Sequence, residues 1–168
     1  TRVRLVGTDL GPGGADVYRL SFAYGGWDQL VEHYSSTLPC IVIQPHTEIE
    51  CPTVPGVGGN MTASVFVGSR RSAQSTFHVR YEKPILKSVS GDGSYEAKTE
   101  GGQVVVLHGS NFGPQSSNYL ILNKHITVRY GPRGSLRYTG QSCVVMQDDD
   151  TIRCLTDVGT GKDHSWHC

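Results

Sequence analysis

Two stretches of the sequence decide the fold: CIVIQPHTEIECPTVPGVGG at residues 40–59 and CVVMQDDDTIRCLTDVGTGK at residues 143–162. In each stretch, two cysteines enclose short apolar runs on either side of a polar turn, and a glycine-rich segment follows. Apolar residues in such short runs, bounded by turn residues, predict two β-strands joined as a hairpin. Because the pattern occurs twice, about 100 residues apart, the chain is predicted to be a tandem array of small domains.

A second shared block lies upstream of each cysteine pair. It reads GTDLGP at Gly7–Pro12 and GSNFGP at Gly109–Pro114, in the same order relative to the cysteines. Strand-like segments with turn signals every eight to twelve residues are typical of two-sheet antiparallel sandwiches. The fold class is therefore predicted to be all-β, with one sandwich at residues 1–83 and another at 84–168.

One segment departs from this pattern. Trp27, Leu30, Val31 and Tyr34 are spaced as residues on one face of an α-helix. We expect one or two helical turns there, packing this apolar stripe on the sandwich. Stacking of a ligand between Trp27 and Tyr34 is the alternative interpretation.

Four of the five cysteines form two equally spaced pairs, Cys40 with Cys51 and Cys143 with Cys154. Each pair flanks a predicted hairpin, where cross-strand neighbours lie close enough to bridge. Two disulfides are the preferred prediction, and buried free thiols are the alternative. Disulfides persist outside the cytosol, so the chain is predicted to be extracellular or on the cell surface. Cys168 is left over, and we expect its partner to lie outside this sequence.

Composition narrows the function. The 15 basic residues equal the 15 acidic ones, which disfavours a nucleic-acid partner because such a partner needs a concentrated basic face. No apolar run is long enough to insert in a membrane. The sequence has no nucleophile elbow, HExxH motif or paired-carboxylate pattern. We expect no catalytic residue, no cofactor and no enzymatic activity.

The order of motifs resembles the IPT/TIG domain, the immunoglobulin-like module of plexins, of hepatocyte-growth-factor-type receptors and of large surface proteins of protists and algae. The second repeat carries the resemblance in the residues Pro84, Gly101-Gly102, Phe112-Gly113, Tyr130-Gly131, Cys143, Cys154 and Gly159-x-Gly161. The first repeat matches from Gly7 and ends in the Phe77, Tyr81 and Pro84 pattern. The family has a proline after the second cysteine; Pro52 matches it, whereas Leu155 does not.

The resemblance implies two consecutive immunoglobulin-like (E-set) sandwiches, both cut at the chain ends. The first is expected to lack its first strand and the second its last strands. Tyr81 and Pro84 would form the interdomain joint. Because no Gly/Ser linker separates the repeats, bending at this joint is expected to be limited.

Several residues suggest local chemistry. Asn60-Met61-Thr62 is an N-glycosylation sequon in a loop; the alternative is an asparagine that only serves a left-handed turn. Asp148, Asp149 and Asp150 suggest calcium, but a solvated hairpin tip is preferred.

Two further groups invite a functional interpretation. His164, His167 and Cys168 resemble half of a metal site, but a strand would direct the two histidines to opposite faces, so no metal is predicted. Arg70 and Arg71 are expected in an exposed turn, with docking of an acidic partner or a glycan as the alternative.

The sequence thus favours a non-enzymatic structural or adhesive module: disulfide-stapled spacer repeats of a surface filament, ciliary coat or cell-surface glycoprotein. The alternative is the ligand-binding ectodomain of a plexin-like adhesion or signalling receptor. Expected partners are neighbouring domains of the same chain and, through self-association or docking, another surface protein; a glycan is a further candidate.

Overall fold

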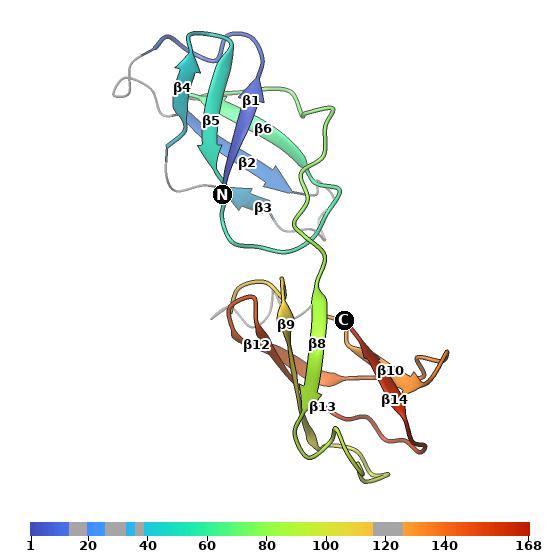
Figure 1. Cartoon of the computed structure of the whole chain (residues 1–168). Coiled ribbons are helices and arrows are strands. Elements are labelled where there is room, and N and C mark those ends of the chain that lie inside the picture. Colours follow the sequence, from blue (N-terminus) through green and yellow to red (C-terminus); the bar gives the residue numbers. More distant parts are fainter. Residues whose placement is uncertain (14–19, 26–32, 36–38, 116–125) are drawn as a thin grey trace. The chain divides into compact units, whose positions relative to one another are not determined.

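A computed structural model describes residues 1–13, 20–25, 33–35, 39–115 and 126–168. Within these ranges the protein is all-β and contains no helix. The chain divides into two compact units, Thr1–Arg80 and Tyr81–Cys168 (Figure 1). The boundary between the units lies three residues before the expected start of the second domain at residue 84.

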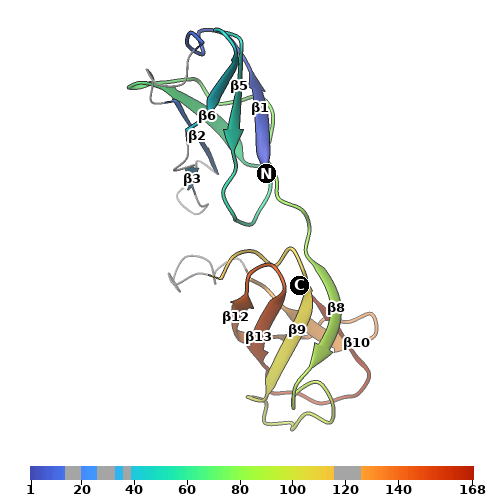
Figure 2. The same ribbon diagram turned by 60° about the vertical axis from the view of Figure 1, so that its left-hand side comes forward.

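The first unit contains two antiparallel sheets (Figures 1 and 2). One has the strand order β1-β5-β4, and the other has the order β3-β2-β6-β7. The described strands are β1 (Arg2–Val6), β2 (Leu20–Gly25), β3 (His33–Ser35), β4 (Ile41–Gln44), β5 (Glu48–Pro52), β6 (Thr62–Val67) and β7 (Arg70–Arg71).

Apolar and charged residues alternate along β1 and β5, which explains why these strands form and which face they bury. Leu5 of β1 pairs with Ile49 of β5, and both side chains are buried. Arg4, on the opposite face of the pleat, forms an ion pair with Glu48 at 2.7 Å. The apolar face covers the unit interior and the charged face meets solvent, as expected for a half-buried antiparallel sheet.

The irregular segment after β7 continues the hydrogen bonding along the outer edge of β6. Ser72 and Ser75 donate their N–H groups to the carbonyls of Val65 and Ala63. Their hydroxyls accept hydrogen bonds from the N–H groups of the same two residues, at 3.0 and 2.9 Å. The serine side chains therefore replace the ladder bonds that a regular strand would make.

The second unit also contains two antiparallel sheets, with the strand orders β12-β13-β9-β8 and β11-β10-β14. Its strands are β8 (Ile85–Ser90), β9 (Val104–Ser110), β10 (Arg129–Pro132), β11 (Tyr138–Thr139), β12 (Gln141–Gln147), β13 (Thr151–Leu155) and β14 (His164–His167). Register shifts interrupt β12 and β8, whereas β9 pairs regularly with β13.

The core of the second unit is built from the buried faces of these strands. Val105, Leu107, Val128 and Cys154 have no exposed surface, and Leu86 and Val89 of β8 pack against the same cluster. Full burial of each such side chain stabilises the fold by about 1.5–3 kcal/mol. The core thus holds β8 to the rest of its sheet.

The two units share the same strand orders in their sheets. The order β4-β5-β1 corresponds to β12-β13-β9, and β3-β2-β6 corresponds to β11-β10-β14. Two strands break the match: β8 has no counterpart among the described strands of the first unit, and β7 has none among those of the second. Both units are sandwich-like, and the duplication inferred from the cysteine spacing extends to their topology.

Two local predictions were wrong. Tyr34 lies in strand β3, paired with Tyr24 of β2, and not on a helix; Trp27, Leu30 and Val31 lie outside the described residues. Arg70 and Arg71 form the short strand β7, paired with Val67 and Phe66, although a turn was expected. In both cases hydrogen bonding to a neighbouring strand outweighs the local pattern.

Candidate functional site

The most distinctive construction of the first unit is a clasp between the GTDLGP loop and the tip of the β4–β5 hairpin. Gly7 donates its N–H to the carbonyl of Thr47 at 3.0 Å, and Leu10 donates to that of His46 at 3.1 Å. In return, the N–H of His46 donates to the carbonyl of Gly11 at 2.7 Å. Three backbone hydrogen bonds thus fix the loop to the hairpin tip.

The second unit repeats the clasp. Gly109 donates to the carbonyl of Asp150 at 2.9 Å, Phe112 donates to that of Asp149 at 3.3 Å, and Asp149 donates to that of Gly113 at 2.8 Å. The same three bonds join the same positions of the repeat. The repeated order of motifs in the sequence therefore corresponds to the same clasp between loop and hairpin tip in both units.

Backbone conformation is repeated as well. Asp9 and Asn111 have φ angles of 58° and 61°, and His46 and Asp149 have 61° and 59°. These are left-handed values, which short polar side chains tolerate better than apolar ones. Four non-glycine residues thus occupy an uncommon conformation because the clasp requires it.

The three aspartates at the second hairpin tip serve this clasp. Asp149 Oδ1 accepts a hydrogen bond from the N–H of Gly113 at 3.1 Å, and Asp148 Oδ1 accepts one from the N–H of Gln115 at 2.5 Å. In the described ranges, no group of three acidic, histidine or cysteine side chains could hold a metal ion. All three aspartates are exposed, as expected at a hairpin tip. The side chains of Asp148 and Asp149 also bind the loop.

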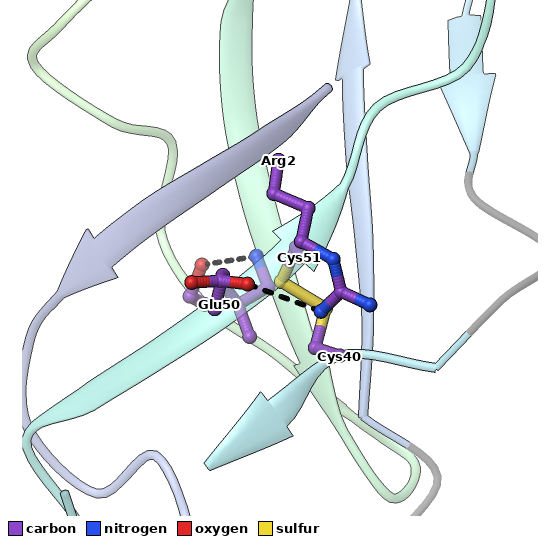
Figure 3. Close-up of a disulfide and its surroundings, with 6 residues drawn as sticks. Arg2, Cys40, Glu50 and Cys51 are labelled. Atoms are coloured by element: carbon purple, nitrogen blue, oxygen red, sulfur yellow. Dashed lines mark hydrogen bonds and ion pairs between the residues drawn. A yellow bond between two sulfur atoms is a disulfide. The ribbon is translucent and has the colours of Figure 1, made fainter. Parts of the chain in front are cut away.

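Both cysteine pairs form disulfides. Cys40, the residue before β4, joins Cys51 of β5 with the Cα atoms 4.2 Å apart, and Cys143 joins Cys154 with a Cα separation of 4.1 Å. All four residues are buried. Figure 3 shows the first disulfide together with Arg2, which forms an ion pair with Glu50 at 3.1 Å. Each disulfide fastens an edge strand to its neighbour at the end of the hairpin opposite the tip, away from the clasp.

A tyrosine in each unit holds the glycine-rich segment after the second cysteine. The hydroxyl of Tyr34 donates to the carbonyl of Val57 and accepts from its N–H, both at 3.0 Å. Tyr138 makes the same two bonds with Thr160, at 2.8 and 3.1 Å. Sequence reasoning missed this pair, although a tyrosine five or six positions before each first cysteine was a visible signal.

Asn60 is exposed and precedes β6, with a φ angle of 57°. Asp163, at the corresponding place before β14, has a φ of 55°. The left-handed turn expected as the alternative is therefore present. It leaves the side-chain amide accessible, so glycosylation of Asn60 stays a prediction.

The histidines at the end of the second unit alternate on β14. The ring of His164 packs near those of Tyr130 and Tyr138, with centroids 5.7 and 5.5 Å away, whereas His167 is exposed. The two therefore do not converge. Cys168 is a free, exposed cysteine, yet partial desolvation raises the pKa of its thiol and makes its thiolate form scarcer.

Tyr130 is the most buried member of an aromatic cluster in the second unit. Its ring stacks on that of Trp166 with the centroids 4.2 Å apart, and its hydroxyl accepts from the N–H of Asp157 at 2.7 Å. Burial raises the pKa of the Tyr130 phenol, an effect that the hydrogen bond from Asp157 opposes. The hydroxyls of Tyr130 and Tyr138 bind backbone groups, whereas Nε2 of His164 is buried and makes no hydrogen bond within the described part of the chain.

The residues predicted to form the joint lie at the start of the second unit. Tyr81 is half-buried and Pro84 is exposed. Between them, Glu82 and Lys83 receive hydrogen bonds from the side-chain amide of Asn111, at 3.2 and 3.1 Å. The left-handed loop residue thus fixes the entry to β8.

Arg70 and Arg71 are exposed at the end of the β3-β2-β6-β7 sheet. The guanidinium of Arg71 lies 5.8 Å from the centre of the Phe66 ring, a cation–π contact. Among the described residues, no helix is long and apolar enough to cross a membrane.

The chain matches no known family profile, no curated protein and no solved structure.

Proposed function

We propose that this chain is a pair of immunoglobulin-like repeats of the IPT/TIG type that serve as stapled spacers in an extracellular structural or adhesive protein. The observation that carries the proposal is the duplicated clasp at the hairpin tip, with a disulfide at the opposite end of the same hairpin in both units. The device joins a loop, a hairpin tip and two strands by the same bonds in both units. Its polar atoms bind other atoms of the same unit, as expected of a scaffold.

The extracellular part of the proposal depends on the disulfides. Each closes a loop with a sequence separation of 11, and such bonds persist in oxidising compartments. The exposed Asn60 fits the same environment because its sequon is an acceptor in the secretory pathway.

Two measurements test this assignment. Antibodies raised against the chain should label intact source cells or their extracellular matrix without permeabilisation. Mass spectrometry of the native protein under non-reducing conditions should find Cys40–Cys51 and Cys143–Cys154 bridged, and a glycan released from Asn60 by an amidase. Reduced cysteines in the native protein, with labelling only after permeabilisation, would overturn the proposal.

A ligand-binding receptor ectodomain is the second candidate. Arg70 and Arg71 favour it because they are exposed and adjacent at a sheet end. A binding screen against acidic glycans with the Arg70→Ala, Arg71→Ala double variant as control separates the two roles. Retention that depends on these arginines supports the receptor.

A further inference from the structure

We propose that this chain associates with a second copy of itself through two different sheet faces. The outer face of strands β12, β13 and β9 in the second unit of one molecule packs on the outer face of β4, β5 and β1 in the first unit of the next. In this contact Arg153 of one copy binds Glu50 of the other. The inference rests on the proposed scaffold function and deepens it, because it names the surfaces through which molecules of the scaffold associate.

The outer face of this sheet in the second unit carries few charges. Buried and partly exposed residues alternate along β9 and β13, so every second side chain points outward. The outward side chains of the three strands are Val104, Val106, His108, Thr151, Arg153, Leu155, Val144 and Met146. This set contains no aspartate, glutamate or lysine, and its Met146 is 49% exposed. A surface that lacks these charges and keeps Arg and Met has the composition of an interface core.

The first unit carries a charged version of the same face. Aligned through the clasps and the disulfides, β1 corresponds to β9 and β5 corresponds to β13. Arg4 then takes the place of Val106, and Glu50 takes the place of Arg153. Both outer positions of the first unit hold charged side chains that pair with each other's neighbours. The topology therefore does not require an apolar outer face, whereas binding of a partner accounts for one in the second unit.

Arg153 lies in the middle of the apolar face. It pairs with Val106 of β9 on one side and with Val144 of β12 on the other. Leu155 points outward from the same strand. Within the described part of the chain, the guanidinium of Arg153 forms no ion pair or hydrogen bond. An arginine enclosed by apolar side chains is typical of interface hot spots, and its chemical partner is a carboxylate.

The outer face of the first unit presents such a carboxylate among apolar side chains. Glu50 Oε1 accepts a hydrogen bond from Arg2 at 3.1 Å (Figure 3), and a carboxylate can accept further donors. Glu50 pairs across the sheet with Ile41. Ile41 and Ile43 are 40% and 43% exposed, and Val6 of β1 is 79% exposed. This face therefore matches the second-unit face in both charge and apolar character.

Charge also decides between the possible pairings of the two faces. Two second-unit faces would bring Arg153 of each copy into one contact that contains no acid, and like charges in an interface are unfavourable. The unlike pairing gives Arg153 a carboxylate. Because the two surfaces differ, each added molecule leaves one face of each kind free, so the association continues beyond a dimer unless it closes into a ring.

Sedimentation equilibrium of the full chain tests the contact. Three short strands form a face at the low end of interface sizes, so the concentration is raised to about 1 mM. The average mass of the native chain should increase with concentration. Arg153→Glu and Glu50→Arg should each weaken this association by roughly tenfold or more, because like charges then meet.

An equimolar mixture of these two variants provides the decisive measurement. The reversed charge of one variant complements the reversed charge of the other, so the mixture should associate although each variant alone does not. Circular dichroism and urea denaturation of each variant check that its fold is retained. Recovery in the mixture cannot arise from two unfolded chains.

The apolar part of the contact is tested with a matched pair of substitutions. Met146→Ser should weaken the association by roughly fivefold, because an exposed apolar side chain of the face is removed. Leu136→Ser is the control, since Leu136 is 40% exposed but lies between β10 and β11, outside the face. It should associate like the native chain.

Four results would overturn the proposal. They are a native chain that stays monomeric at every concentration, equal association of the native and Glu50→Arg chains, no association in the mixture of charge variants, and equal effects of the two serine substitutions. The scaffold role is judged separately by the location and the disulfides of the native protein, so either idea can fail without the other.

Discussion

At the scale of single residues, glycines at the same position of the repeat have different surroundings. Because a Cβ atom on Gly109 would overlap the Ile85 carbonyl and the Phe112 ring, we expect Gly109→Ala to destabilise the second unit by about 3 kcal/mol. Gly7→Ala should change the first unit by less than about 1 kcal/mol. Urea denaturation with hydrogen exchange resolved by peptide measures both. Equal losses in the two units would contradict this prediction.

Tyr130 provides a pH test. Its phenol pKa is raised above 10.0 by burial, so the unfolded chain releases this proton first as the pH rises through its ordinary value. The stability contributed by the protonated phenol is therefore present below about pH 10 and decreases above it. In Tyr130→Phe the alkaline decrease should be smaller, as measured by urea denaturation of the second unit at about pH 9 and about pH 11.

The same variant has an effect at neutral pH. The N–H of Asp157 loses an acceptor that lies 2.7 Å away, which costs about 1–3 kcal/mol when the group stays buried. Tyr138→Phe is the matched control, because its hydroxyl lies in an exposed setting and also binds a backbone N–H. An alkaline slope that is identical in the native and Tyr130→Phe chains would contradict the assignment.

The sequence predicts the place of a residue best when a single interaction, such as a disulfide, decides that place. The duplicated cysteine spacing located both disulfides because each pair flanks a hairpin, where residues on neighbouring strands lie close enough to bond. Tyr34 was misassigned because its spacing from Trp27 also fits a helix. What decides its place is a pair of hydrogen bonds to Val57, 23 positions away, and no local window contains that information.

At the scale of the elements, each disulfide fastens an edge strand whose pairing is irregular. Strand β12 has two register shifts against β13, so the covalent bond replaces missing ladder bonds. We expect Cys143→Ala with Cys154→Ala to lower the stability of the second unit by about 3 kcal/mol, the loop-closure contribution for this length. Thermal denaturation of the double variant, beside the Cys40→Ala, Cys51→Ala chain, measures the effect.

Reduction of the native chain should reproduce that loss without any change in side-chain volume. A double variant as stable as the native chain would show that the β12–β13 hairpin is held by packing alone. Neither substitution should alter the hydrogen bonds of the clasp, which involve backbone atoms of other residues.

Most strands could be predicted because their apolar runs are bounded by turn residues. Strand β7 could not, because Arg70 and Arg71 carry no apolar signal and pair only through backbone bonds to β6. The segment after β7 pairs with β6 through Ser72 and Ser75, whose hydroxyls accept hydrogen bonds from the N–H groups of Val65 and Ala63, an arrangement that residue type alone does not reveal.

At the scale of the whole molecule, two units of similar topology are expected to unfold under force in two similar steps. Pulled from its ends, the chain should unfold in two steps, one for each unit. Reduction of a disulfide with a separation of 11 residues should lengthen the corresponding step by about 40 Å, because each released residue adds about 3.6 Å. Single-molecule force spectroscopy with and without reductant measures this increment, and an unchanged step length would contradict it.

The position of the two disulfides determines what happens when a protease cuts the chain. In each unit the exposed hairpin tip lies between the two bonded cysteines, and exposed tips are where proteases cut. A cut at such a tip leaves both fragments joined through sulfur, and tension passes through that bond instead of the broken backbone. A fibre built from such repeats would keep its continuity after nicking and would part only when a reductant is also present.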